Sequence, residues 1–225
     1  MTSNTTGYRL YDFFSGLEFT HSLPPGFEVM NPYRSEEVLR INKLFYSRFY
    51  NDDRPRTLIM GINPGRFGAG VTGISFTDPV KLDRELGIEN NLQKKPELSA
   101  DFIYSVVRAF GGPKKFFSRY FLSALSPLGF IRNGVNANFY DTGELMAATR
   151  EFILRSVKKQ LEITQSQERC VLLGSGKNTD FFTPLNKEYQ LFRKTDVLKH
   201  PRWIMQYRRR SMDDYVREYL KILSV

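Results

Sequence analysis

Residues 56–76 read RTLIMGINPGRFGAGVTGISF, a short apolar run that continues into a long glycine-rich segment. The apolar run, residues 56–61, ends in glycine and is typical of a buried parallel strand, which is covered on both faces. The segment 61–76 holds five of the chain's 16 glycines. Glycines accept positive φ and let a ligand approach the backbone closely. The stretch therefore predicts a binding loop at the end of a strand.

Outward from this stretch, apolar runs and helical patterns alternate along the chain. Further strands are predicted at residues 120–125, 169–173 and 191–198. Helices are predicted at residues 35–50, 79–86, 99–110 and 141–163. Two more helices are predicted, a short one after the turn at 174–176 and a final one that begins at residue 211. Asp141 is the predicted N-cap of the long helix. The alternation indicates an α/β fold. We predict a single three-layer domain over residues 1–225, with a central, mainly parallel four-stranded sheet flanked by helices. Residues 1–33 are expected to pack on it as an N-terminal extension.

The charge of the chain favours a polyanionic partner. The chain has 225 residues, a formal net charge of +9 and a sequence pI of about 9.6. Nucleic acid is the first expectation and an anionic membrane surface the second, although many basic proteins are merely soluble. No apolar run approaches the roughly 20 residues that cross a bilayer. We therefore expect a cytoplasmic protein that makes no membrane contact.

Cysteine usage excludes several kinds of site. Cys170 is the only cysteine, so an internal disulfide and a four-cysteine zinc or iron–sulfur site are impossible. Its apolar neighbours indicate a small buried side chain in a strand, not a nucleophile. We expect neither a metal nor a cofactor.

Two side chains in the glycine-rich segment suit the chemistry of a pocket. Asn63 stands two residues beyond the predicted strand, and Pro64 fixes the chain direction after it. An amide held there can accept from and donate to a water molecule. Phe76 offers a flat apolar face for stacking on a planar ring. A plain glycine-rich turn with a buried Phe is the alternative, while a dinucleotide fingerprint is excluded because no G-x-G-x-x-G directly follows the strand to open a helix.

The segment 61–76 resembles the first motif of the single-strand-selective monofunctional uracil-DNA glycosylases, G-M-N-P-G-P-F-G-M-A-Q-T-G-V-P-F. It aligns without a gap and keeps Gly61, Asn63, Pro64, Gly65, Phe67, Gly68, Thr72, Gly73 and Phe76. The opening G-I-N-P-G also resembles the mismatch-specific uracil glycosylases of the same superfamily. The resemblance implies that Asn63 positions the attacking water and that Phe76 stacks on a flipped base. The backbone around Ile62, Gly65 and Phe67 would line the pocket.

A second segment begins at one of the two histidines, His200, which follows the last predicted strand. A lone His is more often a packed or surface residue, but active sites of α/β folds gather at strand ends. His200-Pro201 also resembles the start of the superfamily's second motif, H-P-S-P. The resemblance implies that His200 hydrogen-bonds the base carbonyl oxygen beside the glycosidic nitrogen. Such a donor stabilises the charge that develops as the base departs.

After Pro201 the sequence departs from that motif, because Arg202-Trp203 replaces Ser-Pro. Trp203 and the two apolar residues after it either fill the gap left by a flipped nucleotide or pack inward. The arginines Arg202, Arg208, Arg209 and Arg210 suit phosphate contact, with a solvated charge run as the alternative for the last three. We predict that Arg202, Trp203, Arg208 and Arg209 contact DNA.

A third segment, residues 123–130, aligns with V-H-N-x-C-P-L-x-F of the same family. The family Asn reads the polar edge of uracil, and Ala124 stands in its place. Ser126, and secondarily Ser123, offer hydroxyls that both donate and accept and so discriminate less. We predict a shifted or relaxed base specificity that includes uracil and deaminated purines such as xanthine or hypoxanthine.

The turn at 174–178 resembles a phosphate loop only superficially. The glycine required five residues before the Gly-Lys pair is replaced by Val171, and Asn178 replaces Ser or Thr, so binding of a nucleoside triphosphate is rejected. The turn could still place Lys177 and backbone amides on one DNA phosphate.

Together these segments predict a monofunctional DNA N-glycosylase of base excision repair, acting as a monomer on single- or double-stranded DNA. The matched motifs contain no lysine for a Schiff-base lyase step. Two rivals remain open: a nucleic-acid-binding protein that kept the fold but lost catalysis, and an α/β hydrolase of free nucleosides.

Overall fold

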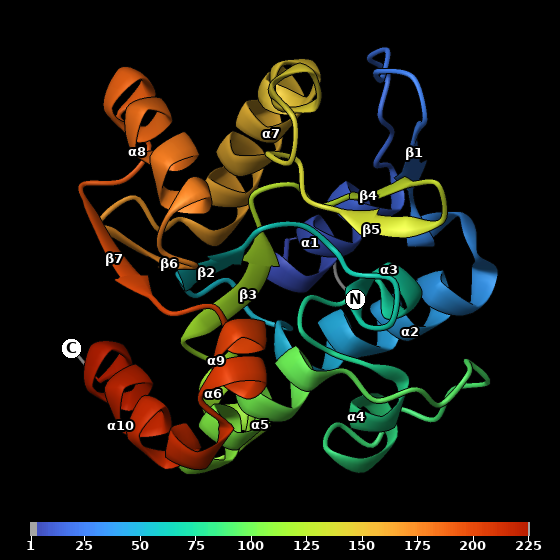
Figure 1. Cartoon of the computed structure of the whole chain (residues 1–225). Coiled ribbons are helices and arrows are strands. Elements are labelled where there is room, and N and C mark those ends of the chain that lie inside the picture. Colours follow the sequence, from blue (N-terminus) through green and yellow to red (C-terminus); the bar gives the residue numbers. More distant parts are fainter. Residues whose placement is uncertain (1–3, 225) are drawn as a thin grey trace.

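The computed structural model describes residues 4–224, and a four-stranded parallel sheet forms its centre (Figure 1). The strands are β2 (Thr57–Gly61), β3 (Tyr120–Ala124), β6 (Arg169–Leu173) and β7 (Lys194–Leu198), in the spatial order β3-β2-β6-β7. All three pairings are parallel, and Ile59 pairs with Leu122 on one side and Val171 on the other. The predicted α/β fold with its parallel four-stranded sheet is confirmed.

Helices cover both faces of this sheet. In Figure 1, α7 (Gly143–Thr164) and α8 (Lys177–Tyr189) lie on one side, while α5 (Leu98–Ala109), α6 (Pro113–Phe117) and α10 (Met212–Leu223) lie on the other. The central strands are therefore buried on both faces, and Cys170 in β6 is fully buried as expected. Strands covered on both faces are built from continuous apolar runs, which explains why local sequence located them.

Apart from the N-terminal helix described below, the remaining helices connect the strands or extend the core. They are α2 (Glu36–Phe49), the short α3 (Ala69–Thr72), α4 (Pro79–Arg84), α9 (Pro201–Tyr207) and two 3-10 turns, η1 (Pro32–Arg34) and η2 (Arg209–Ser211). The prediction of Asp141 as the N-cap of α7 is wrong. Thr142 caps this helix by accepting the N–H of Leu145 at 3.1 Å, whereas Asp141 accepts the N–H of Asn138 at 2.8 Å in the preceding turn.

Two features were not predicted. The segment before residue 33 contains a helix, α1 (Thr6–Ser15), whose Leu10 and Phe14 are buried in the core cluster. A second, three-stranded antiparallel sheet joins β1 (Phe27–Met30), β4 (Gly129–Arg132) and β5 (Val135–Ala137), in the order β1-β4-β5. This small sheet lies beyond the carboxyl end of β3 and supplies one wall of the pocket described below.

The last predicted strand was placed too early, at residue 191, because Leu191 and Phe192 are apolar and buried. Phe192 does not pair with a strand. Its N–H donates to Oδ1 of Asn186 at 2.8 Å, and its carbonyl accepts from Nδ2 of the same residue at 3.0 Å. The Asn186 side chain thus satisfies the backbone groups of Phe192 that a neighbouring strand would otherwise bind, and β7 begins only at Lys194.

Candidate active site

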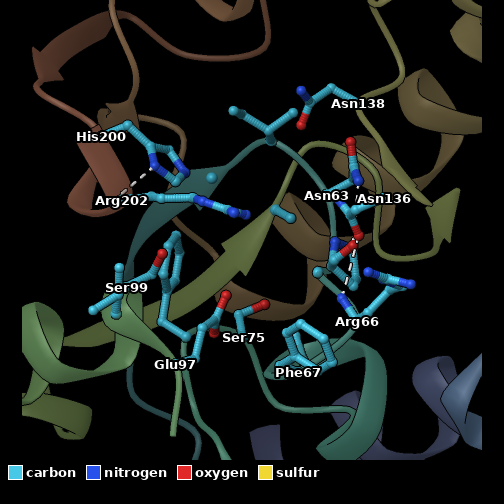
Figure 2. Close-up of a pocket in the computed structure, with 18 of the residues that line it drawn as sticks. Asn63, Arg66, Phe67, Ser75, Glu97, Ser99, Asn136, Asn138, His200 and Arg202 are labelled. Carbon is cyan, nitrogen blue, oxygen red and sulfur yellow. Dashed lines mark hydrogen bonds between the residues drawn. The ribbon is translucent and has the colours of Figure 1, made fainter. Parts of the chain in front are cut away.

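A pocket of about 600 Å³ opens at the carboxyl ends of β2, β3 and β7. Its walls come from the β2–α3 loop, strand β5, the start of α5 and helix α9 (Figure 2). The predicted site residues that line it are Asn63, His200, Ile62, Gly65, Phe67, Phe76, Ser123, Ala124, Arg202 and Trp203. Three segments that are distant in the sequence are therefore brought to one cavity.

The Asn63 side chain is fixed by backbone groups around β5. Its Nδ2 donates to the carbonyl of Ala137 at 3.0 Å and to that of Pro64 at 3.3 Å, while its Oδ1 accepts the N–H of Phe139 at 3.0 Å. An amide oxygen has two lone pairs, so one acceptor site on Oδ1 remains for a water. The amide can orient a water but, lacking a titratable group, cannot take its proton.

The tip of the Phe76 ring reaches the end of β2. A Cβ added to Gly61 would lie 2.6 Å from Cζ of Phe76, so only glycine lets the ring sit there. The backbone of Phe76 is left-handed, with φ of 55°. This region is unfavourable for a bulky residue. The half-buried ring is held in the pocket wall with its tip against the strand.

His200 is the N-cap of α9, and its Nδ1 accepts the backbone N–H of Arg202 at 3.2 Å. Burial, aided by the nearby Arg202 guanidinium, lowers the pKa of His200 to about 4. The imidazole is therefore neutral near pH 7. Because Nδ1 accepts, the hydrogen of the neutral ring is assigned to Nε2, which makes Nε2 a donor toward the pocket.

The two serines of the third segment are already engaged. The Ser123 hydroxyl donates to Oε1 of Gln160, a buried residue of α7. Ser126 is fully buried and does not line the pocket, because its hydroxyl donates to the carbonyl of Leu128 at 2.7 Å. Ala124 does line the pocket and adds no polar group. The hydroxyl hydrogens that the sequence suggested for base recognition are thus committed to acceptors within the protein.

Helix α9 divides its side chains between the core and the pocket. Ile204 and Met205 are buried in the core, so they pack inward and are excluded as residues that could fill the gap left by a flipped nucleotide. Trp203 is half-buried, with its ring 6.2 Å from that of Tyr207. Tyr207, which was not predicted, is 64% exposed and also lines the pocket. It is the most exposed of the aromatic side chains that line the pocket.

The predicted phosphate contacts occupy different places. Arg202 is exposed, and its side chain reaches across the pocket in Figure 2. Arg208 lies over the Trp203 ring at 5.3 Å, and Arg209 is exposed in η2. Lys177 is exposed in the first turn of α8 and is not brought to the pocket wall.

Several polar residues of the pocket carry no signal in the sequence. They are Arg66, Ser75, Glu97, Ser99, Asn136, Asn138 and Gln206. Asn136 accepts the N–H of Arg66 at 3.2 Å and so ties β5 to the β2–α3 loop. Phe67 is 40% exposed at the rim, with the Lys95 ammonium 3.7 Å from its ring centroid. Burial raises the pKa of Glu97 to about 7.

Within residues 4–224, no three His, Cys, Asp or Glu side chains are grouped to hold a metal ion. None of the helices in that range is long and apolar enough to cross a bilayer.

Comparison with known proteins finds a matching family model and a similar solved structure. Residues 47–224 match the family model of the uracil DNA glycosylase superfamily. Among solved structures, the chain resembles the crystal structure of wild-type SMUG2 from Pedobacter heparinus, with 39% sequence identity and a TM-score of 0.94. The match covers 98% of this chain and 97% of that one. No match was found among curated proteins.

Proposed function

Because the chain belongs to the uracil-DNA glycosylase superfamily, we propose that it hydrolyses the N-glycosidic bond of a deaminated base flipped out of DNA. The observation that carries this proposal is the meeting of Asn63, Phe76 and His200 in one pocket. The three residues supply a site for water, a stacking surface and a neutral hydrogen-bond donor. A step in base excision repair is the corresponding role.

In this mechanism the base stacks on Phe76, and with uracil Nε2 of His200 donates to the carbonyl oxygen beside the glycosidic nitrogen. The bond between the sugar C1′ and that nitrogen breaks first, and its electron pair stays on the base. Asn63 holds the water that then attacks the cationic sugar, and the water's proton leaves to solvent. A dissociative path of this kind needs no strong base, which suits an amide. Donors placed on developing charge lower such a barrier by about 3 kcal/mol each.

The basic surface around α9 fits a DNA partner. Arg202 and Arg208 adjoin the pocket, and exposed Tyr207 stands beside them. We propose that the arginines contact phosphates and that Tyr207, rather than Trp203, fills the gap in the stack. Ala124 supports a base range wider than uracil, including xanthine or hypoxanthine. We further propose that the chain acts as a cytoplasmic monomer.

Single-turnover excision from otherwise identical oligonucleotides tests this function. Substrates would carry uracil, xanthine, hypoxanthine or a thymine mispair, each in single- and double-stranded form. Release of at least one deaminated base is expected. Binding without release would instead favour a catalytically inactive binding protein. Release from free nucleosides at a rate insensitive to salt would favour a nucleoside hydrolase, since DNA binding weakens steeply with salt.

A further inference from the structure

Glu97 is the only acidic side chain that lines the pocket within the described part of the chain. It occupies the N-cap position of α5, yet its side chain makes no capping hydrogen bond. The carboxyl turns instead to the β2–α3 loop, where a Cβ on Gly68 would lie 1.9 Å from Oε2. Glycine at position 68 therefore leaves the space that the carboxyl fills. Figure 2 shows Glu97 and Ser75 pointing into the pocket below Arg202.

The Glu97 backbone is anchored while its carboxyl is not. The backbone N–H donates to Oδ2 of the fully buried Asp78 at 2.8 Å. Within residues 4–224, the carboxyl itself has neither a hydrogen-bond nor an ion-pair partner. An unpartnered carboxyl in a half-buried position is costly unless it is neutral or meets a ligand. The Glu97 backbone is thus positioned before any ligand arrives, and the carboxyl is left available to bind one.

The charges around Glu97 favour its neutral form. Burial is the largest cause of its raised pKa of about 7, Asp78 and Asp101 add to it, and Arg202 opposes it. Lys81 is paired with Asp101 at 2.7 Å and so is turned to that acid. The other charged pocket residue, Arg66, donates to the carbonyl of Gly134, and His200 is neutral. A DNA phosphate that draws Arg202 away raises the pKa of Glu97 further.

An acid in this pocket is suited to a base and not to a phosphate, which it would repel. Deaminated bases share a lactam edge, a carbonyl beside a ring N–H. A neutral carboxylic acid carries one donor and one acceptor side by side and can make both bonds to that edge. The hydroxyls of Ser123 and Ser126 donate elsewhere, and Ala124 has no polar side-chain atom. Glu97 therefore supplies a donor–acceptor pair that these positions lack.

We propose that Glu97, as a neutral carboxylic acid, hydrogen-bonds the lactam edge of the flipped base and is a base-contacting residue of this enzyme. The inference rests on the proposed glycosylase function. It also accounts for a wide substrate range, because the acid proton can reside on either oxygen and the lactam edge is common to uracil, xanthine and hypoxanthine.

Single-turnover excision of uracil and hypoxanthine by the full-length chain, from about pH 6 to about pH 9, tests the proposal. The variants are Glu97→Gln, which copies the neutral acid, Glu97→Leu, which removes both bonds, and Glu89→Gln, a matched control at an exposed acid outside the pocket. The wild-type rate is expected to fall about tenfold per pH unit above about pH 7 as Glu97 ionises. Glu97→Gln should lose this fall, and Glu97→Leu should be slower by about tenfold or more at every pH.

The opposite results are equally distinct. A wild-type rate that rises through pH 7, or a Glu97→Gln variant as slow as Glu97→Leu at about pH 6, would show that the ionised carboxylate is the working form and overturn the proposal. Glu97→Leu at the wild-type rate would show that the carboxyl does not touch the base. Thermal unfolding checks folding, and Glu97→Leu should be at least as stable as wild type because it removes a costly unpartnered acid. Wild-type protein that releases no base refutes the glycosylase function itself, and this inference with it.

Discussion

The rings of Phe76 and His200 lie with their centroids 5.9 Å apart and their planes inclined by 49°. A planar base stacked on Phe76 would therefore have one edge beside the imidazole. Neither residue neighbours the other in the sequence. Their proximity follows from β2 and β7 ending at the same edge of one parallel sheet.

Removing the donor on His200 should slow excision without weakening DNA binding. For His200→Ala we expect a loss of about 10²–10³-fold in the single-turnover rate, the usual effect of losing one donor to developing charge. His21→Ala is the matched control, because His21 contacts Arg155 outside the pocket. A rate within about threefold of wild type for His200→Ala would contradict the assigned role.

On acidification, the excision rate should begin to fall only at a pH far below the ordinary pKa of histidine. Because the pKa of His200 is lowered to about 4, the neutral ring persists down to about pH 5. Between about pH 6.5 and about pH 4, this histidine takes up a proton in the unfolded chain but not in the folded one. The free energy of unfolding therefore decreases as the pH falls through this range. Rates measured between about pH 4 and pH 7 should stay level until about pH 5 and then fall. A limb centred near pH 6.5 would show a charged or exposed ring.

Asn63 should matter to both stability and turnover, whereas a similar residue elsewhere should matter to stability alone. Asn63→Ala leaves the Phe139 N–H without its acceptor, which costs about 1–3 kcal/mol, and removes the water site, so most turnover is lost while DNA binding is kept. Asn63→Asp places a carboxylate oxygen against the Ala137 carbonyl, so this variant should be no more stable than Asn63→Ala. Asn186 binds Phe192 by the same pair of bonds, so Asn186→Ala should lose stability but keep excision. Chemical denaturation and single-turnover rates make the comparison.

Arginines beside the pocket should set the salt dependence of DNA binding. For Arg208→Ala we expect the slope of log K against log salt to fall in magnitude by about one, for any DNA sequence. Arg193, which pairs with Glu168 at the opposite end of β7, provides the control. An unchanged slope for Arg208→Ala, measured by fluorescence anisotropy, would remove this residue from the contact surface.

The sequence located those parts of the fold that rest on local physical rules. Central strands are apolar throughout because helices cover both faces, and residues 61–76 carry a composition that few loops share. The small sheet was missed because it pairs residues 27–30 with residues 129–132, about a hundred positions away, through strands of three or four residues. Helix α1 did carry a usable signal, a Thr5 cap and buried Leu10 and Phe14 four residues apart.

The site residues likewise divide into those that local sequence could locate and those that depend on tertiary contacts. Asn63 and His200 follow strand ends and could be placed by topology. Glu97 could not, because an acid after a proline at the start of a helix suggests only a cap, and its approach to Gly68 is a tertiary contact. Nor could the sequence show that the Ser126 hydroxyl donates to the carbonyl of Leu128, within the turn that contains it, and so does not face the pocket. The single-domain organisation stays a prediction.

The left-handed backbone of Phe76 has an evolutionary consequence. A bulky residue at φ of 55° is less favourable there than glycine by about 1–2 kcal/mol. Phe76→Gly would relieve that strain but delete the stacking surface. It would also give up the packing of a half-buried ring against the core, which offsets the relief. Selection for heat resistance alone would therefore be nearly neutral at this position, and a demand for base excision would decide whether the ring is kept. Position 76 is where a thermostability screen should be coupled to an activity screen from the first round.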